Sequence, residues 1–237
     1  YTLVDENTLR NYIENGGRNG VQKFVTTGIS DMSSMFSSTN FNQDISHWDV
    51  SNVTNMGSMF FSSPFNQPIG SWDVSNVTNM GSMFYSGNSQ NPNPFNQDIS
   101  NWNVSSVSNM ELMFTNSNFN QDISDWDVSN VTNMFAMFSS TPFNKPIGNW
   151  DVSNVTNMNV MFAENENFNQ NISTWDVSNV TEMNSMFSTT NFNQNISAWD
   201  VSNVTGMGNM FGYSVFNQDV SNWDVSNVTN MGVMFQY

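Results

Sequence analysis

One motif of about 24 residues recurs along most of this chain, and it constrains the fold more than any other feature. Successive tryptophans are separated by 24, 30, 24, 24, 25, 24 and 24 residues, and they are Trp48, Trp72, Trp102, Trp126, Trp150, Trp175, Trp199 and Trp223. All eighteen methionines fall in nine copies of a cassette, M-x-x-M-F, of which the first ends at Phe36 and the last at Phe235. A repeat of this length buries its apolar side chains only against its neighbours, so the sequence predicts a stacked array.

Each repeat begins with an apolar pattern that indicates a short strand. In the first full repeat the pattern I-x-x-W-x-V-x-x-V covers Ile45, Trp48, Val50 and Val53. It matches the L-x-x-L-x-L pattern of leucine-rich repeats, except that Val53 stands where that pattern has Asn. We therefore expect one short parallel β-strand in each coil.

The cassette that follows predicts a short helical segment. Met56, Met59 and Phe60 have i, i+3, i+4 spacing, which is typical of one apolar stripe of a helix or a 3₁₀ turn. Thr54 or Asn55 is a suitable N-cap. Residues 29–237 are thus expected to form a leucine-rich-repeat-like solenoid of about eight to nine coils. Hydrogen-bond ladders between coils are expected at Asn42, Asn66, Asn96 and Asn120.

The two ends and one loop depart from the repeat. Residues 1–28 lack the motif and are expected to form an N-terminal cap. It would contain a short helix that carries Leu9, Tyr12 and Ile13, is capped by Asn7 or Thr8 and ends at Gly16–Gly17. No C-terminal cap is evident, which suggests a segment of a larger protein. The segment Tyr85–Pro94 accounts for the spacing of 30 residues; such an insertion is either a tolerated surface loop or part of a binding face.

Charge narrows the possible partners. The net charge is −16, and Lys145 is the only Lys or Arg after position 28. Nucleic acid and anionic membranes are poor partners, because both require clustered Lys and Arg. The negative electrostatic field of such a chain favours cationic partners or metal ions. There is no Cys, and no apolar run in the sequence is long enough to span a bilayer.

The full motif, F-N-Q-D-I-S-x-W-D-V-S-N-V-T-N-M-x-x-M-F, closely resembles the repeat of BspA-like surface proteins. Instances run over residues 41–60, 119–138 and 216–235, and the resemblance covers residues 29–237. It implies a leucine-rich-repeat-like solenoid that is exposed on the cell surface or secreted and that mediates contact with host or neighbouring cells. The family has no catalytic motif to carry over.

The carboxylate after each tryptophan is a candidate metal site. A strand would place these side chains on the outer face as an acidic row that binds Ca²⁺ or a basic partner. Alternatively, each Asp accepts a hydrogen bond from the backbone two residues on, in an Asx turn. The row consists of Asp49, Asp73, Asp127, Asp151, Asp176, Asp200 and Asp224, with Asn103 in the third repeat.

The residue before each tryptophan is a candidate partner contact, because it varies while its neighbours do not. Variable outward positions on a constant scaffold are where repeat proteins place ligand contacts, although plain tolerance at an exposed site gives the same pattern. The row consists of His47, Ser71, Asn101, Asp125, Asn149, Thr174, Ala198 and Asn222.

No catalytic constellation is apparent. His47 is the only histidine, and there is no phosphate-binding glycine loop. The methionine pairs fit core packing better than soft-metal binding. We therefore expect a non-enzymatic, extracellular or cell-surface interaction module that binds a protein partner and has no cofactor. The alternatives are a calcium-dependent or carbohydrate-binding adhesive module and a structural spacer.

Overall fold

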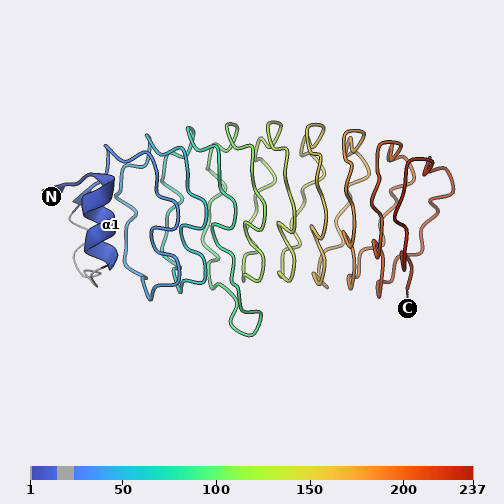
Figure 1. The fold of residues 1–237 in the computed structure, drawn as a ribbon, viewed down its shortest axis with the longest axis horizontal. Coiled ribbons are helices and arrows are strands. Elements are labelled where there is room, and N and C mark those ends of the chain that lie inside the picture. Colours follow the sequence, from blue (N-terminus) through green and yellow to red (C-terminus); the bar gives the residue numbers. More distant parts are fainter. Residues whose placement is uncertain (1, 15–23, 237) are drawn as a thin grey trace.

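The computed structural model describes residues 2–14 and 24–236. Its regular elements lie near the N-terminus: β1 (Thr2–Leu3), α1 (Glu6–Glu14) and β2 (Phe24–Val25), with β1 and β2 paired in parallel. In the rest of the described chain, turns and single-residue bridges take the place of longer helices and strands. Figure 1 shows the repeats as loops of chain lying side by side along the long axis, with α1 at the N-terminal end.

Backbone hydrogen bonds hold successive repeats in a fixed register. The amides at alternate positions of one cassette donate to carbonyls of the next: Met56 N to Asn79 O at 2.9 Å, Ser58 N to Gly81 O at 2.8 Å and Phe60 N to Met83 O at 2.9 Å. Isolated parallel bridges mark the same register, from Asp31–Asn55 through Gly206–Asn230. Equivalent side chains of neighbouring repeats therefore lie next to one another.

The strand expected over I-x-x-W-x-V-x-x-V is not formed. Trp48 N donates to Ile45 O at 3.0 Å and Val53 N donates to Val50 O at 2.9 Å, so two turns occupy this segment. The four apolar side chains are nevertheless at most 4% exposed. A turn closed between positions i and i+3 brings the two flanking residues together, and the spacings I-x-x-W and V-x-x-V fit that geometry.

The expected helical turn is also replaced by another conformation. Met59 N donates to Met56 O at 3.1 Å, but Ser58 has a φ of 57°, which places a type II turn across the cassette. A helix or 3₁₀ turn requires negative φ at every residue. Asn55 does act as a cap, but of a turn: its Oδ1 accepts a hydrogen bond from Gly57 N at 3.0 Å.

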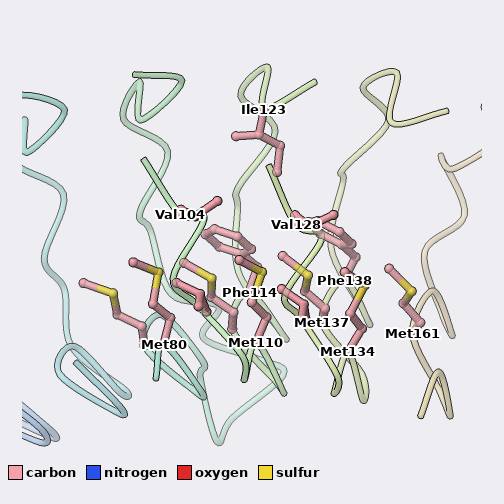
Figure 2. Packing of buried hydrophobic residues seen from close by; sticks show 14 of the residues in the cluster. Met80, Val104, Met110, Phe114, Ile123, Val128, Met134, Met137, Phe138 and Met161 are labelled. Atoms are coloured by element: carbon pink, nitrogen blue, oxygen red, sulfur yellow. The ribbon is translucent and has the colours of Figure 1, made fainter. Parts of the chain in front are cut away.

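The interior consists of columns of identical side chains. Phe114 stacks on Phe138 of the next repeat with ring centroids 5.8 Å apart and on Phe119 at 3.9 Å. Figure 2 shows methionines from successive repeats, among them Met110 and Met134, packed beside these rings. Each indole from Trp72 onward donates Nε1–H to the isoleucine carbonyl of the preceding repeat, so the buried rings leave no polar group unpaired.

The asparagine ladder is present, and it joins side chains to the backbone. The Oδ1 of Asn42 accepts hydrogen bonds from Asn66 N at 3.0 Å and from Gln67 Nε2 at 3.1 Å. Equivalent Asn–Asn bonds continue to Asn217. The amide side chain thus replaces a backbone acceptor at a place where the chain does not form a strand.

The N-terminal helix is where it was expected, with a different cap. Helix α1 begins at Glu6, and Thr8 N donates to Asp5 Oδ1 at 2.7 Å, so Asp5 is the cap rather than Asn7 or Thr8. Leu9 and Ile13 are buried in the same cluster as Ile29 of the first repeat. Gly16 and Gly17 lie outside the described residues.

Arg10 joins this helix to the first repeat. Its guanidinium donates to Ser33 O at 2.8 Å and to Asp31 O at 3.2 Å, and it pairs with the carboxylates of Glu6 and Asp31 at 2.9 and 3.4 Å. At the other end of the described chain, Met231, Val233 and Phe235 are 42%, 58% and 43% exposed. Within residues 2–14 and 24–236, no helix has the length and apolar character needed to cross a membrane.

Candidate interaction surface

The carboxylates that follow the tryptophans are all exposed, and each closes an Asx turn. The Oδ1 of Asp49 accepts hydrogen bonds from Ser51 N at 3.1 Å and from Ser51 Oγ at 2.6 Å. The backbone bond recurs at every later position of the row, including Asn103, whose Oδ1 accepts from Ser105 N at 3.2 Å. The Asx turn predicted as the structural role of these residues is therefore present.

These hydrogen bonds favour the charged carboxylates. Donation from the hydroxyl and amide of Ser75 lowers the pKa of Asp73, while the negative charge of Asp49 opposes the shift. The same balance holds for Asp151, where Ser153 lowers the pKa and the charge of Asp127 raises it. The negative charge of one carboxylate thus acts on the next at these two positions, and the donors of the Asx turns outweigh it for Asp73 and Asp151.

The structure gives this row no ready-made metal site. Among the described residues, no group of three or more His, Cys, Asp or Glu side chains lies close enough to hold a metal ion. A calcium ion takes six to eight oxygen ligands, so it would need carbonyls, waters or a partner beyond the Asp row. Calcium binding by this row stays a prediction.

The variable residues before the tryptophans are likewise exposed in every repeat. Some are tied to the preceding repeat: Thr174 Oγ1 donates to Gly148 O at 2.7 Å, and Ser71 Oγ donates to Ser46 O at 3.3 Å. The structure therefore places this row and the Asp row on either side of the buried indoles, both open to solvent.

A second set of Asx turns was not singled out from the sequence. Asp44 Oδ1 accepts a hydrogen bond from Ser46 N at 2.9 Å, and this bond lowers the pKa of Asp44. The same turn recurs at Asp98, Asp122, Asn171, Asn195 and Asp219. The signal was available, because D-I-S has the same spacing as the D-V-S that follows the tryptophan.

The number of residues per repeat varies in only one segment of the repeat. We call the residues between the phenylalanine that ends a cassette and the phenylalanine that opens the next repeat a return segment. Return segments have four residues except in two places: residues 85–94, the inserted loop, and residues 163–167, the five-residue turn. Figure 1 shows the inserted loop projecting beyond the edge formed by its neighbours.

Buried polar side chains fix the inserted loop. Ser86, 3% exposed, donates to Asn91 O at 2.8 Å, and Asn93, 2% exposed, donates to Phe60 O at 2.9 Å. Asn93 also forms a parallel bridge with Ser117 of the next repeat. The loop is therefore held to the array at its base on both sides.

A buried asparagine fixes the five-residue turn in the same way. Asn165, fully buried, donates to Phe143 O at 2.9 Å, and its Oδ1 accepts from the amides of Asn167 and Phe168, both at 3.1 Å. The residues on either side of it, Glu164 and Glu166, are both exposed.

An open cleft of about 560 Å³, lined mostly by polar residues, lies along the return segments. Ser89 and Pro92 of the inserted loop line one end, and Glu164 and Glu166 of the five-residue turn, with Thr189 of the next repeat, line the other. Ordinary four-residue return segments supply the floor between them, and a smaller cavity of about 260 Å³ lies on the opposite side of the loop. The sequence identified the inserted loop but could not reveal the cleft.

Comparison with known proteins gives one result. A family model described as "Mycoplasma protein of unknown function, DUF285" matches residues 7–94, 89–159 and 140–237. The chain matches no curated protein and no solved structure. The three overlapping matches agree with the tandem repeats that the tryptophan spacing indicates.

Proposed function

We propose that this chain, which belongs to the family described as Mycoplasma protein of unknown function (DUF285), is a non-enzymatic interaction module that presents a polar, acidic surface to a protein partner. The observation that carries the proposal is the contrast within each repeat. The indole is buried and constant, while the residue immediately before it is exposed and different in most repeats.

Rigidity supports this use of the surface. Every repeat is joined to the next by backbone bonds, by an indole–carbonyl bond and by asparagine side chains. A preorganised surface loses little conformational entropy when a partner binds. An array of this kind therefore suits recognition along many repeats, with each contact weak by itself.

The finer architecture and location belong to the same proposal. We assign the array to the leucine-rich-repeat-like solenoids on the repeat length and the stacking register, with turns in place of the strand and helix of such repeats. We assign it to the BspA-like surface proteins on the motif F-N-Q-D-I-S-x-W-D-V-S. On that resemblance the module is extracellular or on the cell surface and contacts host or neighbouring cells. The net charge of −16 favours a cationic partner surface over nucleic acid.

Adhesion of cells that carry the parent protein tests the proposal. We expect deletion of the segment to reduce binding to host or neighbouring cells. We also expect a variant with Ala at positions 71, 101, 149 and 222 to fold normally, because Ala198 already occupies this row, and to bind more weakly. Undiminished adhesion after deletion of the whole segment would overturn the proposal. A control makes conservative changes at buried positions of the same repeats, for example Val74→Ile and Val152→Ile.

A second candidate is a calcium-dependent or carbohydrate-binding adhesive module, and the exposed Asp row favours it. A ligand that binds only the folded state raises the unfolding temperature by mass action. Thermal unfolding in millimolar Ca²⁺ against an EDTA control decides the metal part, since an unchanged midpoint removes it. A purely structural spacer would bind none of these ligands and would leave adhesion unchanged in the alanine variant.

A further inference from the structure

We infer that the cleft between the inserted loop and the five-residue turn is the principal contact site of this module and that it takes a basic side chain, Arg or Lys, from an extended segment of a partner protein. This inference rests on the proposed interaction function and names the place and the chemistry of the contact. Its evidence is independent of the exposed rows beside the tryptophans.

The two length changes lie on the same face of the array. Of the eight return segments, six join phenylalanines five positions apart, and the spacing rises to eleven at Phe84–Phe95 and to six at Phe162–Phe168. Insertions in repeat arrays map to loops on one face, which is often the face that binds. Both insertions here line one and the same cleft.

Buried side chains anchor both ends of the cleft. Ser86 and Asn93 hold the loop, and Asn165 holds the turn, each through hydrogen bonds made by a buried side chain. A tolerated insertion needs no such anchors, because a flexible loop adds little to the free energy of folding. Fixed walls are what a recognition site requires.

The lining of the cleft is acidic at the five-residue turn. Glu164 accepts a hydrogen bond from Ser140 Oγ at 2.7 Å, and within the described part of the chain neither Glu164 nor Glu166 forms an ion pair. The positive charge of Lys145, the one lysine of the repeat region, instead helps to lower the pKa of Asp122. Two carboxylates without a cation, in a chain of net charge −16, offer a guanidinium or ammonium group its counter-charge.

The floor suits a peptide backbone. Ser117, 1% exposed, accepts a hydrogen bond from Phe119 N at 3.3 Å, and no described residue accepts the proton of its hydroxyl. At the matching position of the next repeat, the Thr141 hydroxyl donates to Phe138 O at 2.9 Å. Ser117 therefore differs from Thr141 in that no described residue accepts its hydroxyl proton, and it lies among the residues that line the cleft. No aromatic ring is among the described lining residues, so a sugar ring would find no flat apolar surface there.

The dimensions agree with a short segment. The loop and the five-residue turn are three repeats apart, and three steps of about 4.8 Å give about 15 Å. Four or five extended residues span that distance at about 3.3 Å each. One basic side chain at the end of such a segment would reach the glutamates while the backbone crosses the floor.

The test uses the full chain and a blocked peptide, Gly-Gly-Arg-Gly-Gly, with a citrulline peptide as its neutral twin. Titration is followed by the amide NMR signals of the protein. We expect the Arg peptide to shift the signals of residues 164–167 and 89–91, and the citrulline peptide to bind up to about fivefold more weakly. Signals that move along the Asp rows instead, or equal binding of the two peptides, would overturn the inference.

Two variants locate the site. Glu164→Gln with Glu166→Gln should weaken binding of the Arg peptide up to about fivefold, whereas Asp200→Asn with Asp224→Asn, which removes the same charge and keeps the Asx turns as Asn103 does, should change binding less than about twofold. Deletion of residues 87–92 restores a four-residue return segment and should abolish the shifts at the floor. Equal weakening by both charge variants would show general electrostatic attraction and overturn the site.

Outcomes for the two proposals are separable. If the Glu164→Gln, Glu166→Gln variant binds cells as the unmodified chain does, while the alanine variant of the exposed row does not, the cleft inference fails and the interaction function stands. If a neutral oligosaccharide shifts the cleft signals and the Arg peptide does not, the site is a glycan site and the basic-segment inference fails. If deletion of the whole segment leaves adhesion intact, the proposed function fails, and the peptide titration still decides the chemistry of the cleft.

Discussion

The interior of the array has a nearly constant sequence, whereas the return edge, formed by the return segments, varies in length and side chains. Every repeat contributes to both regions. In the interior the Trp and Met positions and the Phe that ends each cassette recur in every repeat, and stacked rings connect each repeat to two neighbours. At the return edge the length changes from four residues to ten, and the side chains differ between repeats. A substitution in the interior therefore disturbs ring stacking with both neighbouring repeats, whereas the return segments tolerate changes of length and side chain.

The comparison also explains where new chemistry can arise in such a chain. An interior column accepts only side chains that fit above and below identical ones, so it cannot vary without loss of packing. A return segment meets solvent on its outer side and needs only a buried polar anchor, such as Asn93 or Asn165, to be fixed. The cleft lies at the edge for that reason.

The largest effect is expected from truncation of an interior ring. Phe114 is fully buried and stacks on Phe84, Phe119 and Phe138, so Phe114→Ala should lower the free energy of unfolding by about 3–5 kcal/mol. Urea unfolding measures it. The matched control is Phe61→Ala, in a return segment and only half-buried, for which about 1 kcal/mol is expected. Similar losses for the two variants would refute the distinction between interior and edge.

A smaller loss is expected at a glycine where the backbones of two repeats approach closely. A Cβ on Gly148 would lie 2.5 Å from the carbonyl oxygen of Asn171 in the next repeat, so Gly148→Ala must push two backbones apart. We expect a loss of about 2–3 kcal/mol in the same unfolding measurement. Gly28→Ala is the control, because a Cβ there meets nothing within 4 Å. If Gly148→Ala proves as mild as the control, the repeats can separate locally without loss of stability.

A gain is expected at one strained position. Val160 has a φ of 62°, in the left-handed region that a β-branched residue rarely adopts, and Asn209 occupies the matching position two repeats later with a φ of 57°. Val160→Asn should therefore raise the free energy of unfolding by about 1 kcal/mol. The reverse change, Ser58→Val at an equivalent position, should lower it by a similar amount. A loss on Val160→Asn would show that the valine contributes more by packing than it loses by strain.

The sequence predicts the repeat, its burial pattern and several contacts. The spacing of Trp and Met was sufficient to predict the buried positions, because burial depends on which side chains recur and not on the backbone conformation that carries them. The Asn42 ladder and the Asx turn at Asp49 followed from residue type, since short polar side chains cap local backbone in any conformation.

The backbone of the cassette could not be predicted in the same way. Positive φ usually has a glycine signal, but Ser58, Leu112 and Val160 adopt it without one. The tertiary register imposes the turn, because alternate amides must reach the next repeat. The cleft could not be predicted for a related reason. Its lining comes from repeats far apart in sequence, and only their stacking shows that the inserted loop and the five-residue turn line one cleft.

The smallest effect is expected from the exposed Asp row, because exposed charges are screened by water and salt. Hydrogen bonds from serine hydroxyls and amides lower the folded-state pKa of Asp49, Asp73, Asp127 and Asp151. A depressed pKa stabilises the fold above the unfolded value, near about 3.9, and that stabilisation is lost as the pH falls through the folded value.

The free energy of unfolding should therefore fall between about pH 5 and pH 2. Replacement of the four by Asn keeps the turn, as Asn103 does, and removes the titrating group, so the variant should lose less stability in that window. Urea midpoints at pH 7 and pH 3 for both proteins give the answer. Equal losses of stability would place the acid sensitivity at other carboxylates, such as Asp31 beside Arg10. They would also show that titration of the Asp row does not affect the stability of the fold.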